Sequence, residues 1–148
     1  MLLEQLKRLL SLEAQTPSTG PSKDMAMAAL LAEVMLADGH ATAEEQARMA
    51  QLLQRLTQQD PAQVKALLNE SLAQQQEVVS LYAFTAELKN LPIEEREQLL
   101  SALWQLAFID GYLDPEEEGV IRQVADLLYI PHSRFIWLKE QVRQKTAI

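Results

Sequence analysis

The sequence contains no cysteine, few glycines and no long apolar run, and each shortage excludes a class of function. Without cysteine, the 148-residue chain has no disulfide, no thiolate metal site and no cysteine nucleophile, as suits a reducing cytoplasm. Its four glycines leave little material for a phosphate-binding loop, and no nucleotide-binding or serine-hydrolase motif occurs. No stretch reaches the roughly 18 apolar residues that a transmembrane helix needs. No signal peptide is expected either, because charged residues interrupt the N-terminal segment.

Positive charge is also scarce in this chain. There are 13 Lys and Arg against 21 Asp and Glu, which gives a net charge of −8. So acidic a surface repels phosphate backbones, and nucleic acid is therefore excluded as an expected partner. The basic residues Arg134, Lys139, Arg143 and Lys145 belong to an expected final helix, where cations offset the helix dipole. No basic patch is predicted.

The apolar residues recur with helical spacing throughout, and no segment alternates as a strand would. The sequence therefore predicts an all-α protein. Helix boundaries follow from Asp-Gly stops, from Thr42 as an N-cap and from prolines at helix starts. Helices are expected at about 23–37, 75–89, 92–109 and 115–128, and three more begin near Thr42, Pro61 and Pro131. We expect Tyr82, Trp104, Ile136 and Trp137 on inward faces.

The chain divides into an N-terminal amphipathic helix at 1–15, a flexible linker at 16–22 and a helical domain at 23–148. In the first segment Leu3, Leu6, Leu9 and Leu10 form a stripe, and the linker is rich in Pro, Ser, Thr and Gly. The stripe either packs back on the domain or docks on a partner or a membrane surface. Its two acids and two bases argue against strong attraction to anionic lipid.

An internal repeat is the most informative feature of the sequence. At an offset of 72 (110 − 38), the Asp38-Gly39 turn and its following Glu44-Glu45 recur as Asp110-Gly111 and Glu116-Glu117. Apolar positions between them match apolar positions. The sequence therefore predicts two copies of a three-helix unit, bridged by the 75–89 helix and packed with pseudo-twofold symmetry, about seven helices in all.

The stretches ADGHATAEE and IDGYLDPEE, each after an apolar helix, resemble the paired signatures of the TerB-like family. This family includes tellurite-resistance TerB and the TerB-like domain of DjlA-type membrane co-chaperones, and the likeness covers about 23–144. It implies a compact helical fold with an internal repeat, a divalent-cation site near the two turns, and a role in membrane-associated stress-response assemblies rather than catalysis. The matching acids are Asp38 and Glu45 in the first half, and Asp110 and Glu117 in the second. Asp114 has no acidic counterpart, since Thr42 stands there.

The aspartates and glutamates of this candidate metal site also have structural interpretations. Asp38 and Asp110 lie at helix C-termini, where a carboxylate reduces stability by roughly 0.3–1 kcal/mol because it meets the negative end of the helix dipole. This cost favours a functional role for both. The structural alternative is that Asp before Gly is an ordinary turn residue. Glu45 and Glu117 fit capping boxes begun by Thr42 and Asp114. Oxygen-only ligands favour Ca²⁺ or Mg²⁺, with Mn²⁺ third. The spacing excludes an EF-hand, so binding is expected to be weak.

These observations predict a non-enzymatic interaction or stress-response module, cytoplasmic or peripheral to a membrane, with a weak cation site. The alternative is a structural scaffold whose acidic face docks a basic protein partner and binds no metal. A third hypothesis, an enzyme using paired carboxylates, would need a substrate cleft. The two histidines, His40 and His132, lack the HExxH context of a zinc site. The sequence does not indicate an oligomeric state.

Overall fold

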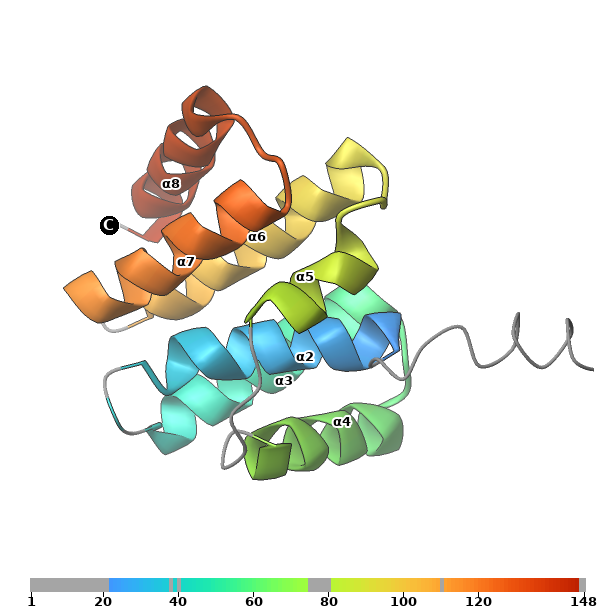
Figure 1. The fold of residues 1–148 in the computed structure, drawn as a ribbon. Coiled ribbons are helices and arrows are strands. Elements are labelled where there is room, and N and C mark those ends of the chain that lie inside the picture. Colours follow the sequence, from blue (N-terminus) through green and yellow to red (C-terminus); the bar gives the residue numbers. More distant parts are fainter. Residues whose placement is uncertain (1–21, 38, 40, 75–80, 110, 147–148) are drawn as a thin grey trace, which may run out of the picture.

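The computed structural model describes residues 22–37, 39, 41–74, 81–109 and 111–146, and these form helices without a strand (Figure 1). The all-α prediction is confirmed. The expected helix at 1–15 and the linker up to residue 21 lie outside the described residues. The helices are α2 (Lys23–Met35), α3 (Ala43–Thr57), α4 (Pro61–Gln74), α5 (Leu81–Leu88), α6 (Ile93–Ala107), α7 (Pro115–Leu127) and α8 (His132–Thr146).

Short polar side chains begin most of these helices. Ser22 accepts a hydrogen bond from the Met25 N–H at 3.2 Å at the start of α2, and Asp60 accepts one from the Gln63 N–H at 2.8 Å at the start of α4. Each bond satisfies an amide that the helix itself leaves unpaired. Pro92 precedes α6 without a side-chain cap, because its ring carries no hydrogen-bond acceptor.

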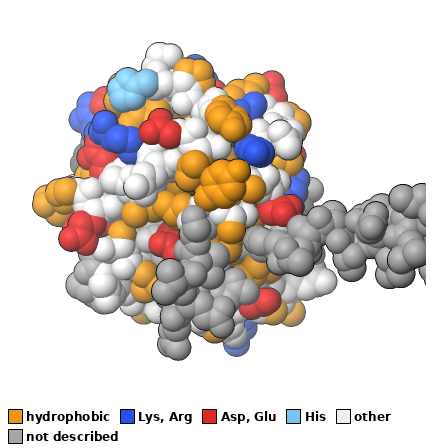
Figure 2. Space-filling model, in the orientation of Figure 1, with side chains coloured by type: hydrophobic (Ala, Val, Ile, Leu, Met, Phe, Trp, Pro, Cys, Tyr) orange, Lys and Arg blue, Asp and Glu red, His pale blue; other side chains and the backbone are white. Residues whose placement is uncertain are grey.

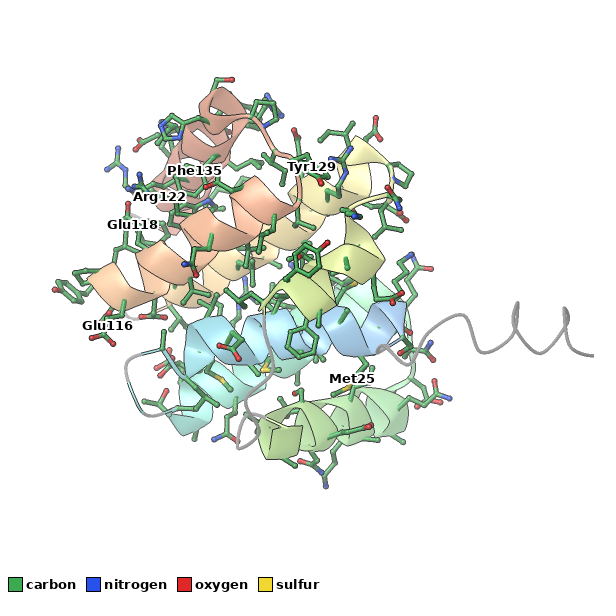
Figure 3. The ribbon with its side chains drawn as sticks, viewed as in Figure 1. Met25, Glu116, Glu118, Arg122, Tyr129 and Phe135 are labelled. Atoms are coloured by element: carbon green, nitrogen blue, oxygen red, sulfur yellow. The ribbon has the colours of Figure 1, made fainter. Side chains whose placement is uncertain are left out.

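Helix α2 is the centre of the domain. It packs against α3, α4, α5, α6 and α7, and it runs through the middle of Figure 1. Its sequence is apolar on nearly every side, as a helix covered on all faces requires. Four alanines with no exposed surface allow the surrounding helices to approach it closely: Ala26, Ala28, Ala29 and Ala32. The Met25 side chain lies on the side of α4 in Figure 3.

Helix α6 organises the second half around Trp104. It packs against both α7 and α8. The Trp104 side chain has no exposed surface, and its ring centroid lies 5.9 Å from that of Phe108 and 5.1 Å from that of Phe135. Aromatic pairs at these separations add to the stability gained from burial. The expectation that Trp104 belongs to the core is confirmed.

The described helices follow the predicted repeat closely in their boundaries. α2 ends at Met35 and α6 at Ala107, and α3 begins at Ala43 and α7 at Pro115, which is the offset of 72 in both cases. The packing pairs also match, because α2 contacts α3 and α4 as α6 contacts α7 and α8. These matches are what a duplicated unit requires, while the pseudo-twofold symmetry itself stays a prediction.

The interior placement predicted for Trp137 and Ile136 was wrong. The exposed fraction is 47% for Trp137 and 39% for Ile136. The buried face of α8 is formed by Phe135, Leu138 and Val142, which share a stripe at helical spacing, and the two residues after Phe135 fall beside it. The Arg134 guanidinium covers part of the exposed indole, 4.3 Å from its ring centroid.

Tyr82 is likewise exposed rather than inward, with 60% of its surface accessible. The buried residues of α5 are Phe84, Thr85 and Leu88. α5 begins at Leu81, and the residues before it, at 75–80, are outside the described part of the chain. Figure 2 shows hydrophobic side chains exposed near the middle of this face, where α5 lies in Figure 1.

A paired guanidinium and carboxylate join α6 to α8. Arg134 donates two hydrogen bonds to Glu97, from Nε at 2.9 Å and from Nη2 at 2.8 Å. These bonds lower the pKa of Glu97 below its ordinary value of 4.5. Bidentate pairs of this kind are stronger than single-point contacts because two parallel bonds fix the geometry.

Replacing Glu97 with glutamine is expected to reduce stability by about 1 kcal/mol near neutral pH. Because the pKa of Glu97 is lowered in the folded state, its contribution is fully present above about pH 4.5 and is lost as the pH falls through the lowered value. Urea unfolding of both proteins from pH 7 to pH 3 should show the difference disappear. Glu70→Gln is the control, because Glu70 is exposed in α4 and forms no ion pair with a described residue. A difference between parent and Glu97→Gln that is constant with pH would contradict this assignment.

Candidate functional site

The described residues on either side of Asp38 and Asp110 follow one backbone pattern. After α2, the Leu36 N–H donates to a carbonyl of the last turn at 2.9 Å, and the Gly39 N–H donates to the Leu36 carbonyl at 2.9 Å. After α6, Phe108 occupies the place of Leu36, and the Gly111 N–H donates to its carbonyl at 3.0 Å. Gly39 has a φ of 96° and Gly111 a φ of 79°, which only glycine adopts without cost. The glycines are therefore required by the turns themselves.

In the first half, Glu45 is buried and closes a capping box. The Thr42 hydroxyl accepts a hydrogen bond from the Glu45 N–H at 3.1 Å, and a Glu45 carboxylate oxygen accepts one from the Thr42 N–H at 3.1 Å. The predicted capping role of Glu45 is confirmed. Its exposed fraction is 8%, which is uncommon for a glutamate.

In the second half, the cap differs from the predicted form. The Asp114 carboxylate accepts a hydrogen bond from the Glu116 N–H at 2.7 Å, one residue earlier than a capping box requires. Asp114 is therefore the N-cap of α7, as predicted, but the cap observed is a bond from the Glu116 N–H rather than the predicted capping box with Glu117. Proline occupies the first position of α7, where its missing N–H needs no partner. Glu117 is nevertheless buried, with 6% of its surface exposed, as its counterpart Glu45 is.

Three of the five predicted metal ligands, Glu45, Asp114 and Glu117, thus have described positions. The other two, Asp38 and Asp110, lie outside the described residues, as does His40. Within the described ranges no three His, Cys, Asp or Glu side chains group closely enough to hold a metal ion. The starts of α3 and α7 both lie toward the left of Figure 1, and Figure 3 shows Glu116 on that side. The metal site stays a prediction.

Thr42→Ala is expected to reduce the free energy of unfolding by about 1 kcal/mol, because it leaves the Glu45 N–H without its hydroxyl acceptor. Chemical denaturation would measure the loss. Thr57, whose hydroxyl donates to the Leu53 carbonyl within the same helix at 2.7 Å, provides a matched Thr→Ala control that leaves no helix N-terminus uncapped. An equal loss in both variants would contradict the capping role.

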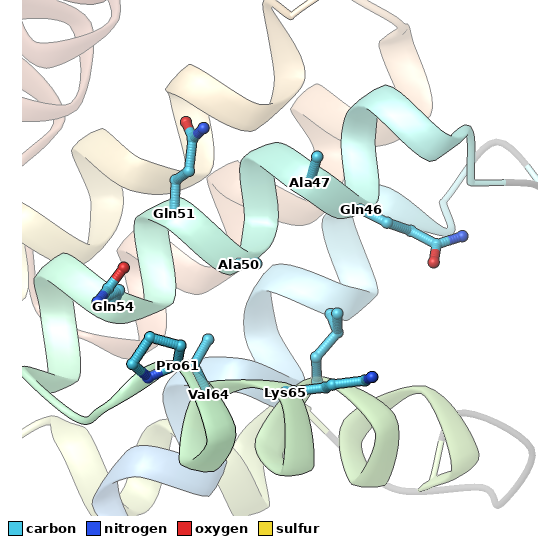
Figure 4. A pocket seen from close by; sticks show the side chains of 9 residues that line it. Gln46, Ala47, Ala50, Gln51, Gln54, Pro61, Val64 and Lys65 are labelled. Atoms are coloured by element: carbon cyan, nitrogen blue, oxygen red, sulfur yellow. The ribbon is translucent and has the colours of Figure 1, made fainter.

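The two halves differ where the third helix of each packs. Between α3 and α4 lies an open groove of about 390 Å³ (Figure 4). It is lined by Gln46, Ala47, Ala50, Gln51, Gln54, Pro61, Val64, Lys65 and Leu68. Between α7 and α8, Figure 3 shows Arg122 near Phe135, with the guanidinium 5.5 Å from the ring centroid, and Glu118 pairs with Lys139 at 3.2 Å. Charged side chains therefore lie between α7 and α8 in the second half, whereas the corresponding place between α3 and α4 in the first half is an open and largely apolar groove.

Comparison with known families decides the classification. The model of the family described as tellurite resistance protein TerB matches residues 24–140. The chain belongs to the TerB family. The match runs from the first turn of α2 into α8, so the TerB domain contains both Asp-Gly turns and both candidate cap regions. The resemblance predicted from the sequence is confirmed. No curated protein and no solved structure matches the chain. None of the described helices of this TerB domain is long and apolar enough to cross a membrane.

Proposed function

We propose that this TerB domain is a non-enzymatic interaction module of tellurite-resistance-associated stress-response assemblies, in the cytoplasm or at the periphery of a membrane. Membership of the TerB family, whose model is described as tellurite resistance protein TerB, supports the association with tellurite resistance. TerB domains are generally non-enzymatic and often mediate protein interactions. The finer part of the proposal is a weak divalent-cation site at the two turns.

The proposal of a cation site rests mainly on one observation. Glu45 and Glu117, 72 positions apart, are both buried, and each follows a glycine of positive φ, although glutamate is among the residues least often buried. The proposed ligands are these two carboxylates with Asp38 and Asp110, and Asp114 adds a carboxylate in the second half alone. Carboxylate oxygens suit Ca²⁺ or Mg²⁺ before Mn²⁺. The bound ion would offset the like charges that the two turns accumulate.

Calorimetric titration of the metal-free protein with Ca²⁺, Mg²⁺ and Mn²⁺ tests this site. We expect weak binding heat in the parent protein and its loss in the double variant Asp38→Asn/Asp110→Asn. Asp60→Asn/Asp126→Asn is the matched control, since it removes the same charge from positions away from the turns and should retain the heat. Absence of heat in the parent protein would refute the cation site.

A scaffold that docks a basic partner is the second candidate. Glu44 and Glu116 occupy equivalent positions in the first turns of α3 and α7, both are exposed, and neither forms an ion pair with a described residue. An amide NMR titration of the metal-free protein with a hexalysine peptide would distinguish the two. Shifts in these first turns, lost in Glu44→Gln/Glu116→Gln but kept in Asp38→Asn/Asp110→Asn, would favour the scaffold.

A further inference from the structure

A second groove, on the surface formed by α3, α6 and α8, differs from the acidic turns in the charge of its side chains. It consists of two adjoining hollows of about 360 and 340 Å³ that share Arg55, Ser101 and Gln105. The remaining lining residues are Arg48, Leu52, Leu56, Gln58, Gln98, Ala102, Gln141, Val142 and Lys145. We call this the α3–α6–α8 groove. None of its lining residues is an aspartate or a glutamate, in a chain that carries 21 of them.

Three cations line the groove without an acidic partner. Arg48, Arg55 and Lys145 form no ion pair with any described residue, and the ion pairs found in the described ranges involve other Lys and Arg side chains. Neighbouring carboxylates elsewhere on the surface neutralise much of the positive charge. The groove therefore concentrates uncompensated positive charge on a protein whose net charge is −8.

Arg48 is held in place by neutral groups. Its Nη1 donates to the Gln51 side-chain oxygen at 2.9 Å, and its Nη2 donates to the Gln105 side-chain oxygen at 2.9 Å. The Gln105 amide nitrogen in turn donates to the Ser101 hydroxyl at 3.4 Å. Because amide oxygens carry no formal charge, they fix the guanidinium without cancelling its charge. An anion that binds here meets a donor whose conformational freedom is already reduced.

The floor of the groove is apolar, and amide side chains lie beside it. Leu52, Ala102 and Val142 have exposed fractions of 2%, 3% and 4%. Gln98 and Gln141 come from α6 and α8 and offer both donors and acceptors. A small inorganic anion would use only the cations. An apolar floor with amide side chains alongside also suits the side chains and the backbone of a peptide.

We propose that the α3–α6–α8 groove binds an acidic peptide segment of a partner protein. Aspartate or glutamate side chains of the segment pair with Arg48, Arg55 and Lys145, its backbone bonds to the amide side chains, and an apolar side chain lies on the floor. The rest of the acidic surface repels extended polyanions such as nucleic acid or an anionic membrane, and a short segment confined to the groove avoids that repulsion. This interaction is independent of the cation site at the turns.

A titration of the ¹⁵N-labelled full chain with a hexaglutamate peptide at low salt tests the proposal, since such contacts are screened at high salt. We expect amide shifts confined to α3, α6 and the C-terminal half of α8. The variant Arg48→Gln/Arg55→Gln/Lys145→Gln should lose about tenfold or more in affinity, which corresponds to several exposed charge contacts. The variant Lys23→Gln/Lys65→Gln/Lys89→Gln changes the net charge equally and should bind as the parent does.

Equal losses in the two triple variants would show general electrostatic attraction and overturn the proposal. So would inorganic phosphate, or vesicles of phosphatidylcholine with phosphatidylglycerol, if either displaced the peptide from the same residues at comparable concentration. If the Arg48 variant fails to fold, as judged by circular dichroism, Arg55→Gln/Lys145→Gln replaces it, because both of these side chains are exposed. Addition of Ca²⁺ or Mg²⁺ tests the turns separately, so failure of one proposal leaves the other standing.

Discussion

Replacing Trp104 with alanine is expected to lower the free energy of unfolding by about 3–5 kcal/mol, a large share of the total stability of an ordinary domain. The indole has no exposed surface, and its removal would leave a cavity between Phe108 and Phe135. The Lys139 amino group, 5.5 Å from the ring centroid, would lose its aromatic contact as well. Urea denaturation followed by circular dichroism would measure the loss.

Trp104→Phe is the matched variant for this test. The indole N–H has no hydrogen-bond partner among the described residues, so phenylalanine retains a buried ring and removes an unsatisfied donor. We expect a loss of only about 1–2 kcal/mol, from the smaller ring. Comparable losses in the two variants would contradict the conclusion that a buried ring at this position is enough to stabilise the fold.

Replacing Ala29 with aspartate is expected to prevent folding. Ala29 lies in α2 with no exposed surface, and the helix is enclosed by five others. A buried carboxylate without a partner costs several kcal/mol, and the extra volume adds strain to a close contact. Such a cost approaches the whole stability of a domain. Circular dichroism and amide NMR spectra would show the loss of helical signal and of dispersed resonances.

Ala66→Asp provides the control for this prediction, since Ala66 is exposed in α4. We expect a stability change within about 0.5 kcal/mol and an unaltered fold. A folded Ala29→Asp protein would show that the helices around α2 separate more readily than their packing indicates.

The helix boundaries could be predicted from sequence because local chemistry determines them. Thr42, Asp60 and Pro115 each supply a cap or a fixed backbone angle at the residue where a helix starts. Gly39 and Gly111 supply the positive φ that ends a helical stretch. These effects act within four residues, so they do not depend on the rest of the fold.

The faces of the helices were harder to predict than their boundaries. In α8, apolar residues lie both on and beside the buried stripe, and periodicity alone did not separate Trp137 from Phe135. The choice depends on the position of α6, which packs against α8 and which the local sequence does not encode. Tyr82 in α5 illustrates the same limit, since the buried stripe of that helix passes through Phe84 and Leu88.

The two candidate sites also differ in whether the local sequence could predict them. The acidic turns could be found from sequence because each lies within one short segment and occurs twice. The α3–α6–α8 groove could not, since Arg48 and Arg55 come from α3 whereas Lys145 comes from the end of α8. The groove brings together Arg48, Arg55 and Lys145, which the sequence pattern does not group. Lys145 was assigned only to the dipole of its own helix.

The central position of α2 has a mechanical consequence. The chain enters this helix at Ser22, and Gln59 fastens its first turn to the α3–α4 connection by a 3.0 Å bond to Asp24. A load applied through the N-terminal end is therefore transmitted straight to the innermost helix rather than to a peripheral one. Pulling α2 out of the domain would break its contacts with five helices at once. The domain is therefore expected to unfold under force in one cooperative step rather than helix by helix.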